Sequence, residues 1–286
     1  MTTLTLTAYL KLKATYLALK KNKKLFAGPF LGEFGWELFC WQGYIRYLSK
    51  DYDHTTVVCR SGHHALYRDF ADNILEYDPP EYNPDCQYNK GNSGSLPLPP
   101  DSSYDHMPTN SVHAPSYQPN NGTFDSRYPQ IFYQYQNVNK NLKPFNVIIH
   151  ARSRISSGGI KTDNRNLSEE NWNIIVSYLK GLGFSVASIG HPSASLHIKE
   201  TEDLRGISLD DLVSYFCTCK FVIGPSSGPM HLAALCSSDL IVWSGDVNNK
   251  YRYETAWNVF KNKVSYINGW SNVNLDKVKN SINEYK

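Results

Sequence analysis

Short apolar runs alternate with helical patterns along the second half of the chain. Each run is a few residues long and ends at polar residues or glycine, which predicts a buried strand. These runs cover residues 146–150, 184–189, 221–223 and 239–243. Between them, apolar residues recur at helical spacing, and Ser168 and Ser208 stand at the N-cap positions of two predicted helices. Such alternation is typical of a parallel sheet with helices on both faces.

The first part of the chain repeats this alternation over a shorter length. It predicts strands at 24–29 and 54–59, helices at 37–48 and 62–70, and a glycine-bearing loop at 32–35. We therefore expect a reduced N-terminal α/β domain over residues 1–77 and a fuller one over 141–286.

The intervening residues, 78–140, interrupt the pattern. The stretch 78–130 holds 10 of the 15 prolines and four aliphatic residues, Leu96, Leu98, Met107 and Val112. It cannot bury a core of its own, so we interpret 78–140 as an extended connector. Two roles stay open for it: a passive linker, or a segment whose tyrosines pack on a domain or a ligand.

Composition narrows the class of partner. A net charge of +3 argues against a nucleic-acid partner. The six cysteines show neither a CxxC pair nor zinc-site spacing, which fits a reducing, cytoplasmic compartment. Residues 1–24 hold six lysines and no acidic residue, and 8–24 could form a basic amphipathic helix. That helix is either a peripheral contact with the inner face of a membrane or a surface helix packed on the domain.

The turn after the strand at 221–223 predicts an anion site. Gly224 opens a Gly-Pro-Ser-Ser-Gly-Pro turn, and a helix follows it. Free N–H groups at a helix N-terminus attract anions, and the Ser226 and Ser227 hydroxyls beside Gly228 could add donors. The alternative is a simple strand-to-helix turn. His231, in the first turn of that helix, is a further candidate ligand contact, and its alternative is a purely structural role.

Four cations follow the strand at 146–150 before the next helix begins. They are Arg152, Arg154, Lys161 and Arg165. Because parallel strands end at one edge of a sheet, this cluster should face the Gly224–Gly228 turn and form a diphosphate cradle with it. The alternative for any one of these cations taken alone is a solvated loop charge.

Two carboxylates, Glu33 and Glu37, lie in the loop and helix start of the first domain. Either could act as the general base that activates a sugar-acceptor hydroxyl. Glu37 could instead only complement the helix dipole.

Residues 204–236 are similar to the donor-site stretch of the heptosyltransferase-type glycosyltransferases, glycosyltransferase family 9. From Ser227 the string Ser-Gly-Pro-Met-His-Leu-Ala matches that family nearly letter for letter. The loop 161–167 resembles the basic loop of the family. Leu31-Gly-Glu resembles its Leu-Gly-Asp loop, whose Asp is the proposed base, so Glu33 is the counterpart.

The resemblance implies the GT-B architecture, in which two Rossmann-like parallel-sheet domains face each other across a cleft. The C-terminal domain would bind a nucleotide-sugar donor and the N-terminal domain a glycan or glycolipid acceptor. The implied reaction is a single inverting displacement that needs no metal and no cofactor besides the nucleotide-sugar substrate. The chain departs from the family at Ser226, where an Asp usually contacts the donor sugar, and this argues against heptose as the sugar.

Other functions on the same scaffold stay open. A nucleotide-sugar 2-epimerase would need no acceptor site, which the short first domain favours. A fucosyltransferase is suggested by the basic run His150-Ala-Arg-Ser-Arg. A non-catalytic sugar- or nucleotide-binding protein would keep the cradle without the base.

Overall fold

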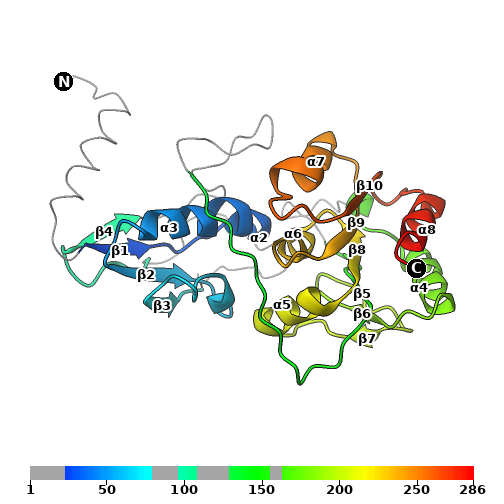
Figure 1. Ribbon diagram of the computed structural model, residues 1–286, viewed down its shortest axis with the longest axis horizontal. Helices are drawn as coiled ribbons and strands as arrows, with labels where there is room; N and C mark the ends of the chain where they lie inside the picture. Colours follow the sequence, from blue (N-terminus) through cyan, green and yellow to red (C-terminus); the bar gives the residue numbers. More distant parts are fainter. Residues whose placement is uncertain (1–22, 79–95, 108–128, 155–162) are drawn as a thin grey trace.

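Each half of the chain forms a wholly parallel β-sheet, which confirms the predicted fold class (Figure 1). The computed structural model describes residues 23–78, 96–107, 129–154 and 163–286. The predicted helix of residues 8–24 lies outside these ranges, except for Lys23 and Lys24, which lead into the first strand. Lys161 also lies outside them. Within the described ranges, no helix combines the length and hydropathy that crossing a membrane would require.

The N-terminal sheet has the strand order β3-β2-β1-β4. Its strands are β1 (Lys24–Ala27), β2 (His54–Cys59), β3 (Asn73–Glu76) and β4 (Tyr104–Met107). The helix after β1 is continuous from Phe34 to Ser49 but changes pitch. It comprises α2 (Phe34–Trp36), the π-helical η1 (Glu37–Trp41) and α3 (Gln42–Ser49).

Two features of this domain differ from the sequence prediction. The predicted helix at 62–70 is wrong, since only the 3₁₀ turn η2 (His64–Leu66) forms there. Gly62 has a φ of 77°, outside the right-handed helical region, and so cannot start an α-helix. Strand β4 was missed because its sequence, Tyr-Asp-His-Met, has no apolar run. It pairs in parallel with β1, so the residues expected as a connector contribute a strand to the N-terminal sheet.

The C-terminal sheet has the order β10-β9-β8-β5-β6-β7. Its strands are β5 (Val147–Ile149), β6 (Val186–Ser188), β7 (Glu202–Asp203), β8 (Phe221–Pro225), β9 (Asp239–Ser244) and β10 (Val264–Asn268). Its helical segments are η3 (Asp163–Arg165), α4 (Glu169–Gly181), α5 (Leu209–Thr218), α6 (Gly228–Leu235), α7 (Val247–Tyr251), the π-helical η4 (Arg252–Ala256) and α8 (Leu275–Asn283).

Helices cover both faces of this sheet. α5 and α6 lie on the side of the N-terminal domain, and α4 and α8 pack together on the opposite side (Figure 1). The predicted N-caps are confirmed: the Ser168 and Ser208 hydroxyls accept the amides of Asn171 and Asp211. Pro229 lies in the first turn of α6, as predicted.

Aromatic side chains join the two domains. Phe39, in η1, stacks on Trp257, just after η4, with ring centres 4.8 Å apart and planes 4° apart. Trp36 meets the same Trp257 edge-on at 5.1 Å. One cluster of buried apolar residues therefore extends from the N-terminal sheet into α6.

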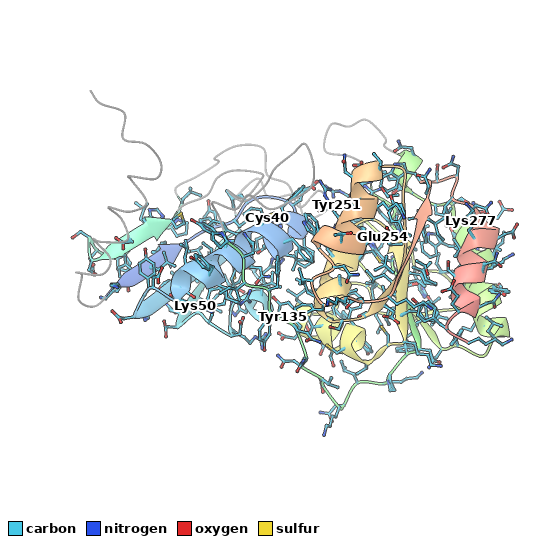
Figure 2. The ribbon with its side chains drawn as sticks, turned by 45° about the horizontal axis from the view of Figure 1, so that its top comes forward. Cys40, Lys50, Tyr135, Tyr251, Glu254 and Lys277 are labelled. Carbon is cyan, nitrogen blue, oxygen red and sulfur yellow. The ribbon has the colours of Figure 1, made fainter. Side chains whose placement is uncertain are left out.

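The chain segment after residue 129 also runs along the domain junction. Figure 2 shows Tyr135 at this junction, where its side chain is buried. Its amide donates to the carbonyl of Leu235 at 3.0 Å, and its carbonyl accepts the Cys217 thiol at 3.1 Å. Hydrogen bonds of its backbone thus hold the connecting segment against α5 and α6.

We predict that Gly28→Ala severely destabilises the N-terminal domain. Gly28 has a φ of 100°, and an added Cβ would lie 2.3 Å from the carbonyl oxygen of Val58 in β2. Gly62→Ala is the matched control, because Gly62 also has a positive φ, of 77°, but no atom within 4 Å of an added Cβ. Urea unfolding should show a loss of about 1 kcal/mol for Gly62→Ala and at least about 2 kcal/mol more for Gly28→Ala. Equal losses would contradict the clash.

Candidate functional site

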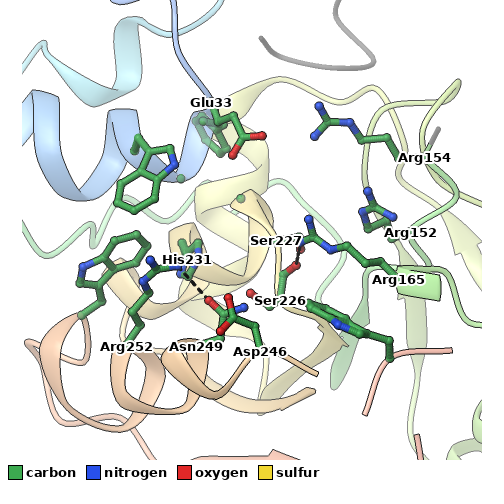
Figure 3. Close-up of a pocket in the computed structure, with 16 residues that line it drawn as sticks. Glu33, Arg152, Arg154, Arg165, Ser226, Ser227, His231, Asp246, Asn249 and Arg252 are labelled. Atoms are coloured by element: carbon green, nitrogen blue, oxygen red, sulfur yellow. Dashed lines mark hydrogen bonds between the residues drawn. The ribbon is translucent and has the colours of Figure 1, made fainter. Parts of the chain in front are cut away.

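A cavity of about 210 Å³ lies between the two domains. The C-terminal domain contributes residues that follow β5, β8 and β9, so the carboxyl ends of these strands meet at one edge as predicted. The N-terminal domain contributes Glu33 and the start of its long helix. Figure 3 shows Glu33 pointing across the cavity toward the side on which Arg152, Arg154 and Arg165 lie.

Three of the four predicted cations line this cavity. Arg152 is 5% exposed and donates to the side-chain oxygen of Asn166. Arg165 donates to the carbonyl oxygen of Ser226 at 2.9 Å, and its guanidinium lies 4.8 Å from the ring centre of Trp270. Burial lowers the pKa of Arg152 to about 9, helped by Arg165 and Arg154 and opposed by Glu33. Arg152 is therefore still cationic at neutral pH.

The turn before α6 is more fully hydrogen-bonded than predicted. The Ser226 amide donates to the carbonyl of Trp243 at 2.8 Å, because β8 continues beside β9 through Pro225. The Ser227 amide donates to the Tyr253 hydroxyl at 3.3 Å, and the Ser227 hydroxyl is hydrogen-bonded to His150 Nδ1 at 2.9 Å. These two amides are thus not free for an anion, which corrects the sequence-based expectation. The Gly228 amide, at the start of α6, makes no hydrogen bond to a described residue.

His231 lines the cavity but is packed as an aromatic ring. Its ring stacks on Tyr253, with centres 4.6 Å apart and planes 12° apart, and Trp257 meets its edge. Burial lowers the pKa of His231 well below its usual value, and the positive charges of Arg252 and Arg165 lower it further. The side chain is therefore neutral and adds no charge to the site. Gly35 leaves it room, since an added Cβ would come within 3.0 Å of its ring.

The two candidate bases lie in different environments. Glu33 lines the cavity, whereas Glu37 does not and is fully buried. Burial alone would raise the pKa of Glu37, but His63 and Arg60 and the hydrogen bonds of His63 and Tyr67 outweigh it and lower that pKa. Glu37 is thus a buried carboxylate without access to the cavity, and Glu33 is the candidate base that the geometry favours.

The wall of the cavity formed by α7 and η4 was not predicted from the sequence. Asp246, Asn249 and Arg252 line it, opposite the other arginines (Figure 3). Arg252 donates to the Asn249 side-chain oxygen at 3.0 Å and lies 5.0 and 5.1 Å from the ring centres of Trp36 and Trp257. One signal in the sequence could have identified this wall. The three polar residues follow a predicted strand and are spaced three apart, which places them on one face of a helix.

A second cavity, of about 310 Å³, also lies between the domains. It shares Phe34 with the first cavity, and Pro229 of α6 lines it. Gly190 and Gly206, which follow β6 and β7, form part of its C-terminal wall, and His63 lies on its N-terminal wall. The two cavities thus flank the start of α6.

This chain has two parallel-sheet domains that face each other, which is the fold of the heptosyltransferase-type glycosyltransferases. The heptosyltransferase TibC of enterotoxigenic E. coli, described as dodecameric and iron-containing and solved with ADP-D-β-D-heptose, is similar with a TM-score of 0.51 and 16% identity. The match covers 85% of this chain and 62% of TibC, so the chain spans less than two thirds of that protein.

Two further structures match along nearly their whole length. A family 9 glycosyltransferase of Veillonella parvula has a TM-score of 0.52 and 12% identity, with 93% of each chain covered. The E. coli ADP-heptose lipopolysaccharide heptosyltransferase II has a TM-score of 0.52 and 13% identity, with 92% of this chain and 98% of that chain covered. No family model and no curated protein matches the sequence. At these identities the likeness establishes the fold.

We predict that His150 makes the protein less stable in acid. Burial lowers the pKa of His150 to about 3, with Arg152 contributing. Between pH 6.5 and about 3 the unfolded chain binds a proton that the folded chain does not, so stability falls as pH falls through that window. His150→Gln should reduce the slope of unfolding free energy against pH by up to about 1.4 kcal/mol per pH unit.

The control for this measurement is His191→Gln, because His191 is exposed. Denaturant unfolding at several pH values between 4 and 7 gives the slopes. If His150→Gln and His191→Gln both keep the slope of the original protein, His150 is not the group that titrates.

Proposed function

We propose that this protein is a glycosyltransferase that moves a sugar from a nucleotide-diphosphate sugar to an acceptor hydroxyl. One observation carries the proposal: arginines of the C-terminal domain and a carboxylate of the N-terminal domain face each other across one cavity. An anionic leaving group and a general base are the two partners that such a transfer requires on opposite sides of the reacting carbon.

The diphosphate would lie against Arg152, Arg154 and Arg165. Arginine forks bind phosphate oxygens in pairs, and the start of α6 adds the Gly228 amide and the positive end of the helix dipole. The described lining holds four arginines against two carboxylates, Glu33 and Asp246, an excess of two positive charges. That excess matches the double charge of a bridging diphosphate.

The nucleoside would occupy the second cavity. The first cavity, at about 210 Å³, is too small for a whole nucleotide sugar, for which ligand pockets of roughly 300–1,000 Å³ are usual. The second adds about 310 Å³ beside the same helix start, and Ile207, Leu209 and Leu212 give it an apolar side. TibC binds ADP-heptose, so an adenine nucleotide belongs among the first candidates.

The chemistry we propose is a single inverting displacement without metal. The acceptor hydroxyl gives its proton to Glu33, its oxygen bonds to the anomeric carbon, and the bond from that carbon to the diphosphate oxygen breaks. The nucleoside diphosphate leaves with the electron pair, and Arg152 and Arg165 stabilise its charge. We further propose that the acceptor is a glycan or glycolipid and that the protein acts in the cytoplasm.

We predict that Glu33→Gln strongly reduces turnover but keeps donor binding. A thermal-shift panel of nucleoside diphosphates and nucleotide sugars, with and without Mg²⁺, first identifies the donor class. Release of nucleoside diphosphate from that donor should then fall about 10²- to 10⁴-fold in Glu33→Gln, while its thermal shift stays. Glu170→Gln, which changes an exposed carboxylate of α4, is the control. Unchanged turnover in Glu33→Gln would contradict Glu33 as the base, whereas donor binding without turnover in the original protein would favour a binding protein.

We predict that Arg165→Met weakens binding of every diphosphate. It removes a cavity cation and the hydrogen bond to the Ser226 carbonyl. Calorimetry with inorganic pyrophosphate and with the selected nucleoside diphosphate should show at least about tenfold weaker binding of both. Arg205→Met is the control, because Arg205 pairs with Asp203 and lines neither cavity. Equal losses in both variants would place the anion site elsewhere.

A further inference from the structure

His63 reaches the second cavity from the N-terminal domain. It lies on the cavity wall, and its ring packs against Phe34, with centres 5.4 Å apart. The opposite wall belongs to the C-terminal domain, where Gly190 and Gly206 both have positive φ angles and bring the backbone to the cavity without side chains. A group bound there would touch both domains.

A buried carboxylate fixes the orientation of this histidine. Glu37 accepts His63 Nδ1 at 2.9 Å and the Tyr67 hydroxyl at 2.8 Å, and the Arg60 guanidinium lies 3.9 Å away. The Tyr67 hydroxyl and the Arg60 guanidinium are both donors, which agrees with an ionised Glu37. Because an ionised carboxylate can only accept, Nδ1 carries the proton.

The other ring nitrogen, Nε2, is left for a ligand. It makes no hydrogen bond to a described residue, and on a neutral ring it is an acceptor. A nucleoside offers donors to such an acceptor, among them the ribose hydroxyls and an exocyclic amine of the base. Phosphate oxygens offer none unless they are protonated, so Nε2 distinguishes the nucleoside from the diphosphate.

We propose that His63 accepts a hydrogen bond from a ribose hydroxyl or exocyclic amine of the bound nucleoside, with Glu37 as its positioning residue. The inference rests on the proposed function, since it takes the second cavity as the nucleoside site. The N-terminal domain would then contribute to recognition of the donor as well as of the acceptor. Glu37 would also have a role other than that of the base: it fixes the proton on Nδ1.

The test compares the selected nucleoside diphosphate with inorganic pyrophosphate. His63→Ala should weaken binding of the nucleoside diphosphate about three- to tenfold and change pyrophosphate binding less than twofold. His64→Gln is the matched control, because this neighbouring histidine pairs with Glu76 and does not line the second cavity. Calorimetry on the full chain gives the dissociation constants, and thermal unfolding without ligand checks that each variant is folded.

Modified nucleotides identify the donor group. If it is a ribose hydroxyl, the 2′-deoxy or 3′-deoxy diphosphate binds the original protein more weakly but binds His63→Ala like the unmodified compound. If it is an amine, a nucleotide with an oxo group in place of that amine gives the same pattern of affinities. An example is inosine diphosphate compared with adenosine diphosphate.

Glu37→Gln tests the positioning role. An amide can donate as well as accept, so it no longer fixes the proton on Nδ1. Nitrogen chemical shifts of the His63 ring should report a protonated Nδ1 in the original protein and a shift toward the other tautomer in the variant. Affinity for the nucleoside diphosphate should fall with that shift while pyrophosphate binding stays.

The outcomes separate the two proposals. If the original protein binds neither pyrophosphate nor any nucleoside diphosphate, the proposed function fails and the role of His63 with it. If it binds both and His63→Ala binds them equally well, or loses both alike, only the role of His63 is overturned.

Discussion

The aromatic contact between the two domains determines how the two walls of the cavity lie relative to each other. Phe39 stacks on Trp257, and Trp36 meets the same ring edge-on, so the long N-terminal helix is held against the C-terminal domain. Glu33 stands immediately before this helix, and Arg252 lies over Trp36 and Trp257. The separation of Glu33 from the arginines is therefore fixed by apolar packing rather than by ion pairs. The Arg68–Asp210 pair between the domains is about half exposed, and such pairs contribute at most about 1 kcal/mol.

Positive charge in the site comes from arginine alone among the described lining residues. The two histidines beside the turn, His150 and His231, are buried next to those arginines, and their pKa values are lowered accordingly. Neutral rings can pack tightly there without adding repulsion to an already crowded set of cations. Burial also strengthens the attraction between the arginine charges and an anionic ligand, because less water screens these charges.

Most helices and strands of the C-terminal domain could be predicted from local sequence patterns. The arrangement of the site could not, because it depends on contacts between residues that are far apart in the sequence. Strands such as β8 and caps such as Ser208 were predictable because apolar runs and capping spacing are local signals. Strand β4 was not, because it is held by backbone pairing with β1 and its side chains carry no alternation. Glu33 and Glu37 look alike in sequence. Only folding shows that one faces the cavity and the other is enclosed by residues of a loop 23 or more positions away.

Both aromatic residues of the stacked pair lie in or next to a π-helical segment. Phe39 lies within the π-helical segment η1, and Trp257 directly follows the π-helical segment η4. The amide of Gln42 reaches back to the carbonyl of Glu37, and that of Trp257 to Arg252, five residues in each case. A turn closed over five residues holds one more residue than an α-helical turn. Any alignment of this chain with a protein whose helix is regular at either place must therefore open a one-residue gap inside a helix, where alignments are normally kept continuous.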